Sequence, residues 1–381
     1  MISLISKLPN VGTNIFSVMS QLAIENDAIN LSQGFPDFEC PSELVQLVTK
    51  HMNKGHNQYA SMPGLLKLRE KVAEKINKLH GASYSPDTEI TITAGGTQAI
   101  FTALSAVVQP NDEVIILEPA YDCYSPSIKL LGGLVKTLEL SAPDYKIDWG
   151  MLKKLISNYT RLIILNSPHN PTGLVFTDED IKQLIHLTRE TDILILSDEV
   201  YEHIIFDEKP HLSVAKYPEL RERSFIVASF GKLFHNTGWK MGYCVAPAWL
   251  MAEFRKVHQF LVFSVNTPMQ YAIADFLSDE SFYLELRYFY QQKRNYFKKM
   301  MLHTRFDLLP CHGSYFQCVQ YERIANEPDL EFAKRLTRDF GVAGIPVSAF
   351  FSHKTDEHVL RFCFAKKQET LEKAVERLIK V

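Results

Sequence analysis

The sequence predicts an α/β protein with two domains: a large domain around a seven-stranded, mostly parallel sheet between helices, and a smaller α+β domain. Three observations carry this prediction. The chain of 381 residues exceeds the size at which one hydrophobic core stops growing. Short apolar runs alternate with helix-like stretches from Glu89 onward, and the texture of the sequence changes after about Ser281. Such alternation predicts βαβ units and a sheet covered on both faces.

Seven short apolar runs are the candidate strands of the large sheet. Helical stretches, such as residues 97–108 and 178–189, separate several of them, which favours parallel pairing. The runs are residues 90–93, 114–117, 134–138, 162–165, 193–196, 225–228 and 241–245. Ligands of parallel sheets bind beyond the carboxyl ends of the strands, so we expect the functional residues in the loops that follow these runs.

The C-terminal part is expected to form the smaller domain. It begins with a charged helical stretch over residues 283–300, continues with short strands near residues 313–319 and 359–364, and ends in a helix. The N-terminal stretch up to Pro41 is rich in Gly, Pro and Asn and has no long helical period, so we expect it to pack on this domain or at the cleft. We assign residues 1–44 and 282–381 to the small domain and residues 45–281 to the large one.

Composition points to a globular protein that acts on a small molecule. Hydrophobic residues make up 46% of the chain and charged residues 22%, which excludes extensive disorder. The formal net charge is only -3, and no run of five or six like charges occurs. We therefore expect no nucleic-acid partner and no membrane partner.

The six cysteines are scattered without CxxC spacing, so we expect reduced thiols, no disulfide framework and no metal site. The first twelve residues contain too few apolar residues for a secretory signal, and no 18-residue apolar stretch follows. Together these features predict a soluble, cytoplasmic protein.

Polar residues with chemical potential follow two of the candidate strands. Lys232 comes after the small residues of a Ser-Phe-Gly-Lys stretch, where a carbonyl cofactor could approach closely, although a solvated loop lysine is the alternative. Asp198 follows another strand and could keep a pyridine nitrogen protonated, which makes the ring an electron sink. Alternatively, Asp198 is the N-cap residue of the next helix. Tyr201 could reach the ring hydroxyl, or could simply be a packing residue.

Two further loops complete the candidate site. Residues 166–173 (NSPHNPTG) form a rigid turn that presents Asn170, although an ordinary turn would also use such residues. The stretch Ala-Gly-Gly-Thr at residues 94–97 opens a helix, and its glycine-rich backbone offers free N–H groups and a favourable dipole to a phosphate.

In this order, the motifs resemble those of the class I and II aminotransferases, the fold type I pyridoxal-phosphate enzymes. The resemblance covers the whole chain. It includes residues 30–38 (NLSQGFPDF), 57–60 (NQYA), 63–64 (PG), 237–240 (TGWK) and 360–364 (LRFCF). Within the family, the chain is most similar to the methionine aminotransferases and to the kynurenine and glutamine transaminases.

The resemblance implies a role for each motif residue. Lys232 would carry the pyridoxal 5'-phosphate, Asp198 would pair with the pyridine nitrogen, and Tyr201 and Asn170 would contact the ring hydroxyl. Tyr121 would stack on the ring. The phosphate would be bound by Gly95, Gly96, Thr97, Ser229, Lys240 and Tyr59, with Tyr59 coming from a second subunit of a homodimer. Arg361 would hold the substrate carboxylate through its planar fork, with Gly34 and Asn170 assisting.

Two positions depart from relatives of the aspartate type. Lys240 stands where those members carry arginine, and Tyr121 stands where others have tryptophan or phenylalanine; both keep the expected role. The apolar stretch of residues 261–263 (LVF) lies near the place of a second substrate-binding arginine in dicarboxylate-specific relatives, and Phe16 and Tyr59 add aromatic surface. A neutral, apolar or aromatic substrate side chain is therefore favoured. Phe16 and Phe263 are alternatively core or dimer-interface residues. Methionine, phenylalanine, tyrosine, glutamine and kynurenine all remain possible.

The same residues bear on several other possible functions. The nearest is a carbon-sulfur β-lyase on the same pyridoxal-phosphate scaffold, which the sequence hardly separates from a transaminase. A non-enzymatic regulator needs a DNA-binding module, for which we expect no room before the motifs that begin at Asn30. A nucleotide-binding enzyme and a metalloprotease are disfavoured because GxGxxG, GxxxxGK[ST] and HExxH do not occur.

Overall fold

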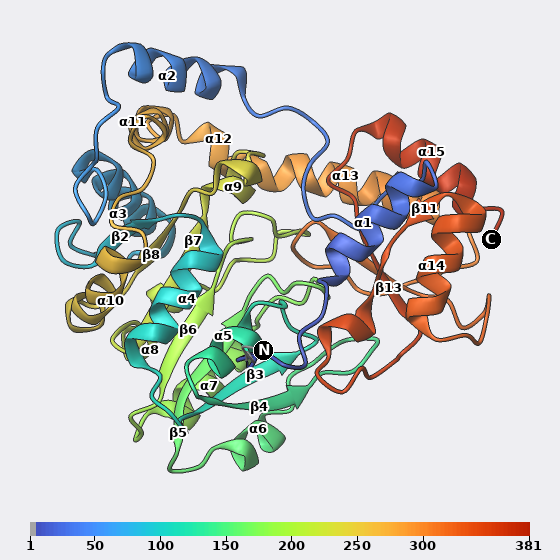
Figure 1. The fold of residues 1–381 in the computed structure, drawn as a ribbon, viewed down its shortest axis with the longest axis horizontal. Helices are drawn as coiled ribbons and strands as arrows, with labels where there is room; N and C mark the ends of the chain where they lie inside the picture. The colour runs from blue at the N-terminus through green and yellow to red at the C-terminus, as the bar shows by residue number, and fades with distance from the viewer. Residues whose placement is uncertain (1–4) are drawn as a thin grey trace, which may run out of the picture.

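The computed structural model describes residues 5–381 and contains the predicted seven-stranded sheet (Figure 1). The strand order is β2-β8-β7-β6-β5-β3-β4. Strands β3 to β7 run parallel to their neighbours among themselves, whereas β8 is antiparallel to both β2 and β7. The strands are β2 (Ile90–Thr93), β3 (Glu113–Glu118), β4 (Leu134–Glu139), β5 (Thr160–Asn166), β6 (Leu194–Asp198), β7 (Ser224–Ser229) and β8 (Gly242–Val245). Each predicted run lies in one of them or begins one residue before it, so the prediction of a mostly parallel sheet is confirmed.

Helices cover both faces of this sheet, which explains why its strands are continuous apolar runs. On one face, Leu104 of α4, Ile128 of α5 and Phe254 of α10 pack in one core with the sheet residues Ile116 and Leu196. A larger core covers the other face. The helices are α2 (Ser42–Asn53), α3 (Leu66–His80), α4 (Gly96–Val107), α5 (Tyr124–Leu130), α6 (Trp149–Leu155), α7 (Asp178–Thr188), α8 (Pro218–Arg221), α9 (Phe230–Leu233), α10 (Ala248–Leu261) and α11 (Thr267–Phe276), with the 3-10 turns η1 (Val214–Lys216) and η2 (Thr237–Trp239).

The C-terminal part forms a second, four-stranded antiparallel sheet in the order β12-β13-β10-β9. The two predicted strands correspond to β10 and β13, and the predicted long helix is divided at Glu285 into a short α12 and a longer α13. The elements are α12 (Ser281–Leu284), α13 (Leu286–Met301), β9 (Asp307–Leu308), β10 (Phe316–Gln320), α14 (Asp329–Phe340), β11 (Val342–Ala343), β12 (Ile345–Pro346), η3 (Val347–Phe350), β13 (Val359–Cys363) and α15 (Gln368–Leu378).

The expectation that no long helix precedes Pro41 is wrong. Helix α1 (Ile15–Glu25) begins at Asn14, whose side chain accepts a hydrogen bond from the Phe16 backbone N–H at 2.7 Å. The apolar residues Ile15, Phe16, Met19, Leu22 and Ala23 recur at helical spacing, so the signal was present, but the Gly, Pro and Asn of the surrounding stretch favoured an irregular structure. Figure 1 shows α1 lying against α14 and β11, while β1 (Ile29–Asn30) pairs with β11. The N-terminal stretch thus packs on the C-terminal part, as expected, for the residues that the structure describes; residues 1–4 lie outside them.

Among residues 5–381, no helix combines the length and the apolar character needed to cross a membrane.

Candidate active site

The carboxyl ends of β2, β5, β6 and β7 surround a cavity of about 230 Å³, which the C-terminal part closes from the other side. Residues far apart in the sequence meet here. The cavity is lined by every predicted site residue except Tyr59 and Phe263, namely Phe16, Gly34, Gly95, Gly96, Thr97, Tyr121, Asn170, Asp198, Tyr201, Ser229, Lys232, Lys240 and Arg361. Gln33, Ile100, Asn166, Val200, Thr237 and Phe316 complete the lining.

Lys232 lies in α9, the single turn that follows β7, and its side chain points into the cavity. Its Nζ donates a hydrogen bond to the Tyr315 hydroxyl at 2.6 Å and a longer one to the Gly34 carbonyl at 3.3 Å. Burial lowers the pKa of Lys232 to about 8, and the positive charges of Arg361 and Lys240 act in the same direction. A lysine amine in this range loses its proton far more readily than a solvated one, as a nucleophile and proton carrier requires.

Asp198 is the last residue of β6, and only 3% of it is exposed. The Tyr124 hydroxyl donates to its Oδ2 at 2.5 Å, and the Val200 backbone N–H donates to its Oδ1 at 3.3 Å. Burial raises the pKa of Asp198 to about 6, against the lowering effect of the Tyr124 hydrogen bond. No helix begins after Asp198, so the N-cap alternative does not apply in the described structure. A buried carboxylate here suits a cationic ring nitrogen.

Tyr201 and Asn170 reach the cavity from different loops. Tyr201 is buried with its ring against that of Tyr315, at a centroid distance of 5.1 Å. Burial raises the pKa of Tyr201, which therefore keeps its proton and remains a hydrogen-bond donor. The Asn170 backbone N–H donates to the Asn166 side chain at 2.8 Å, which ties the turn to the end of β5.

Arg361 in β13 is fully buried, and its guanidinium group faces the cavity. Nη1 donates to the Asn170 side-chain oxygen at 2.7 Å, and Nη2 donates to the Ser32 carbonyl at 2.8 Å. The guanidinium carbon lies 3.8 Å from the ring centre of Phe316 and 5.2 Å from that of Phe16. Among the described residues, Nε has no protein partner. A buried, partly unpaired fork suits a carboxylate ligand.

The first turn of α4 and the loop around Lys240 form an anion cradle. Gly95 has φ +81°, a conformation that favours glycine, and an added Cβ would lie 3.4 Å from the Lys240 side chain. The free N–H groups at the start of α4 point to the same cavity as Lys240 and Ser229. The side-chain hydroxyl of Thr97 lies 3.3 Å from that of Tyr121. A phosphate would thus meet a helix N-terminus, hydroxyl groups and a cation.

These groups fit pyridoxal phosphate. A lysine amine, a buried carboxylate and an anion cradle lie around one cavity and match the carbonyl, the ring nitrogen and the phosphate of the cofactor. Gly34 shows the same tight fit on the substrate side, because an added Cβ would lie 2.8 Å from the Phe316 ring.

Besides the lining residues that were not predicted, sequence reasoning missed two tyrosines that hydrogen-bond to ionisable groups of the site. Tyr124, the first residue of α5, donates to Asp198 and lies three residues after the predicted Tyr121, which was the available signal. Tyr315 lies between Lys232 and Gly34 and donates to the Gly34 carbonyl at 2.5 Å. No signal in the sequence indicated Tyr315, since it is 83 residues from Lys232.

Tyr59 and Phe263 do not reach the cavity of their own chain. Their rings meet edge to face, with centroids 5.3 Å apart, and Tyr59 is 82% exposed. Phe263 is 49% exposed. Both therefore lie on an aromatic surface outside the cavity.

The fold and site define a pyridoxal-phosphate-dependent aminotransferase. The sequence profile of the family "Aminotransferase class I and II" matches residues 26–378, and the chain belongs to this family. It is 48% identical to the methionine aminotransferase of Escherichia coli (strain K12) over 98% of this chain and 97% of that one. It is 33% identical to kynurenine–oxoglutarate transaminase 1 of Rattus norvegicus, over 98% and 97% of the two chains.

Similarity to a solved structure supports the same family assignment. The crystal structure of YbdL from Escherichia coli, described as having a methionine aminotransferase function, superposes with a TM-score of 0.97 at 46% identity and full coverage of both chains. The relatives named here are transaminases, and the β-lyase alternative gains no support from them.

Proposed function

We propose that this aminotransferase moves the amino group of methionine or of an aromatic amino acid to a 2-oxo acid. The observation that carries the substrate class is the setting of Arg361, which is surrounded by the aromatic rings of Phe16, Phe316 and Phe350. The similarity to a methionine aminotransferase and to a kynurenine transaminase supports the same class.

Each lysine or arginine in the cavity is then assigned one group of the substrate or of the cofactor. Arg361 binds the α-carboxylate through its fork, and its hydrogen bond to Asn170 fixes the orientation of that fork. Lys240 binds the cofactor phosphate, and Lys232 binds its carbonyl carbon. These three are the only lysine and arginine residues in the described lining, so a second carboxylate on the substrate meets no cation from this chain. Neutral side chains are thereby favoured over those of aspartate and glutamate.

Proton transfer falls to Lys232. Bound pyridoxal phosphate supplies an electrophilic carbonyl and a ring that withdraws electrons from the α-carbon. The Lys232 amine would take up the α-proton and give it back during the transfer. Asp198 would keep the ring nitrogen protonated, and Tyr201 and Asn170 would hold the ring hydroxyl. Tyr315 holds the Lys232 amine close to the Gly34 backbone.

An incubation of purified holoenzyme with methionine and a 2-oxo acid tests this proposal. Mass spectrometry should detect the 2-oxo acid of methionine together with the amino acid formed from the acceptor, and no turnover should occur without the acceptor. A β-lyase would instead release pyruvate and ammonia from a cystathionine-like substrate without an acceptor. Turnover of aspartate in preference to methionine would overturn the substrate class.

We propose further that two subunits share each active site. The exposed rings of Tyr59 and Phe263 contact each other, and the exposed Phe260 (87%) and Leu261 precede Phe263 at the end of α10. Exposed large apolar residues gathered in this way suggest an interaction site. Burial of this surface against a second copy would bring Tyr59 to the phosphate of the partner's cofactor, as the resemblance implies.

The domain division proposed from the sequence, residues 1–44 with 282–381 and residues 45–281, follows the separation of the four-stranded and seven-stranded sheets. The pairing of β1 with β11 supports the assignment of the N-terminal stretch to the small domain. A cytoplasmic location is proposed because all six cysteines, each within the described residues, are free thiols.

A further inference from the structure

Two consecutive carboxylates lie at the end of β6 and point to opposite sides of the sheet. Asp198 lines the cofactor cavity and receives its hydrogen bond from Tyr124, in the core that contains α4 and α5. Glu199 contacts Val214, which belongs to the core on the other face. This alternation is the ordinary side-chain pattern of a strand. Glu199 is 2% exposed, so two carboxylates are buried side by side.

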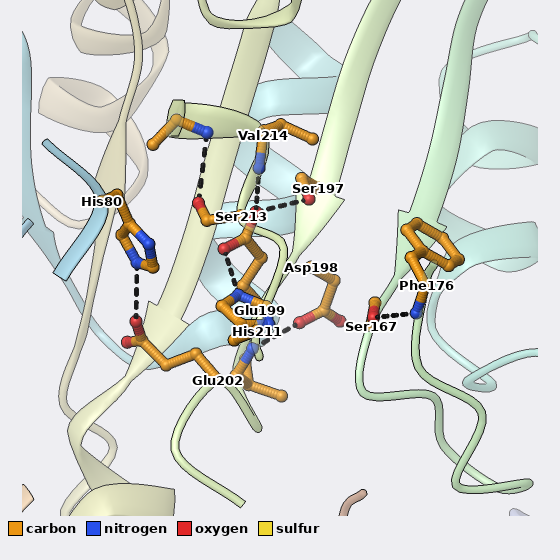
Figure 2. A network of polar contacts seen from close by, with 12 residues as sticks. His80, Ser167, Phe176, Ser197, Asp198, Glu199, Glu202, His211, Ser213 and Val214 are labelled. Carbon is orange, nitrogen blue, oxygen red and sulfur yellow. Dashed lines mark hydrogen bonds and ion pairs between the residues drawn. The ribbon is translucent and has the colours of Figure 1, made fainter. Parts of the chain in front are cut away.

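Figure 2 shows how Glu199 is held behind the site. Its Oε2 accepts a hydrogen bond from Nε2 of His211 at 2.7 Å. Its Oε1 accepts from the Ser197 hydroxyl at 2.8 Å and from the Val214 backbone N–H at 3.2 Å. His211 has a side chain that is 8% exposed and forms the one ion pair that Glu199 makes in the described structure.

The charge of Glu199 matters for Asp198 because like charges at short range disfavour each other's ionised form. Although burial raises the pKa of Glu199, the electrostatic effect and hydrogen bond of His211, joined by the electrostatic effect of His80, hold it below its ordinary value. Glu199 therefore remains an anion next to Asp198, and His211 is its ion-pair partner.

The other ionisable groups near His211 gather around Glu202, although His80 also lowers the pKa of Glu199. The ring of His80, at the end of α3, lies 5.8 Å from that of His211 and faces Glu202. Glu202 is paired with Lys75 at 2.6 Å and lies 3.6 Å from His203. Glu202 thus has its own cation, and only His211 forms an ion pair with Glu199 among the described residues.

We propose that His211 is a positioning residue of the aminotransferase: through its ion pair with Glu199 it balances the second buried carboxylate at the end of β6, so that Asp198 stays ionised beneath the cofactor ring. His211 touches neither cofactor nor substrate and acts only through Glu199. The inference rests on the proposed role of Asp198.

The pH midpoint of the visible absorption band of the holoenzyme is the readout, because a purely structural role would not move it. His211→Gln leaves an unbalanced negative charge, which favours the protonated form of the bound cofactor and should raise the midpoint by about one pH unit. Glu199→Gln removes the carboxylate that stabilises a charged His211, so neither charge remains and the midpoint should stay at the wild-type value. The double variant Glu199→Gln/His211→Gln restores neutrality and should return the midpoint to the wild-type value.

A matched control is His51→Gln, because His51 is a buried histidine paired with Asp275 at 2.8 Å, on α2 and outside the cavity lining. It should lower thermal stability and leave the midpoint unchanged. If His211→Gln does not fold, His211→Asn takes its place and should raise the midpoint in the same way. Wild-type midpoints in every soluble variant would overturn the proposal. Failure of the Asp198 role itself would appear separately, as an unchanged midpoint in Asp198→Asn.

Discussion

The Tyr124 hydroxyl donates a hydrogen bond to Oδ2 of Asp198 at 2.5 Å, and both side chains are buried. A hydrogen bond to an ionised acceptor stabilises the charged form. Tyr124 therefore opposes the effect of burial, which alone would drive Asp198 towards its neutral form. With the proposed role of Asp198, the electronic function of the cofactor would depend on a residue of α5 that lies outside the cavity lining.

Replacement of Tyr124 by phenylalanine removes this donor and should raise the pKa of Asp198 further. A lost hydrogen bond to a charged group predicts a decrease in kcat/KM of about tenfold at neutral pH. The decrease should be larger at pH 6 than at pH 8, since Asp198 then takes up its proton more readily. Steady-state kinetics across this range measure it. Tyr217→Phe is the control, because that hydroxyl makes no hydrogen bond to protein in the described structure.

Asp198 should also destabilise the cofactor-free protein. Its folded-state pKa of about 6 lies above the ordinary value of 3.8, so the folded state binds this proton more tightly than the unfolded state does. The resulting stabilisation is present below pH 4 and is lost as the pH rises through 6. Cofactor-free Asp198→Asn should therefore be more stable than wild type at pH 7, by on the order of 2 kcal/mol, and no more stable at pH 4. Thermal unfolding at both pH values checks this, and a pH-independent difference would contradict it.

Arg361→Lys keeps the charge and loses the planar fork. It should raise the KM for methionine and phenylalanine and lower kcat/KM by about 100-fold, because a buried bidentate contact is lost and Asn170 loses its donor. Kinetics with both substrates measure the effect. Arg335→Lys, on the surface of α14, is the matched control and should behave as wild type. An unchanged KM in Arg361→Lys would count against carboxylate binding at this residue.

Subunit complementation tests the proposed shared site. Lys232→Ala and Tyr59→Ala should each be strongly impaired alone. If Tyr59 serves the partner's cofactor, a mixed dimer contains one intact site, with Lys232 from one subunit and Tyr59 from the other. Co-refolded mixtures should then exceed the summed activity of the two parents. Strictly additive activity would show that Tyr59 contributes to the active site of its own chain or to no active site.

The sequence predicts the large sheet well for a physical reason. Strands covered on both faces must be apolar throughout, so each run is readable without knowledge of its partners. The topology of a parallel sheet then predicts that the functional residues lie in the loops at the carboxyl ends of its strands. The prediction failed for α1, whose apolar residues recur at helical spacing but lie in a stretch that its Gly, Pro and Asn content marks as irregular.

The sequence does not indicate which residues far apart in the chain contact each other in the fold. Tyr315 meets Lys232 only because the second sheet folds over the carboxyl ends of the first, and nothing near Tyr315 marks it as a partner. Similarly, the pairing of Glu199 with His211 depends on the loop that returns from residue 204 to η1. The roles of Tyr59 and Phe263 remain predictions, since they depend on a second subunit.

The absorption spectrum of the purified protein tests directly whether Lys232 binds pyridoxal phosphate. We expect a visible band from bound pyridoxal phosphate that Lys232→Ala alters, and that methionine or phenylalanine, but not aspartate, converts to the spectrum of the pyridoxamine form. Absence of any band after addition of pyridoxal phosphate would contradict the cofactor site and the mechanism built on it.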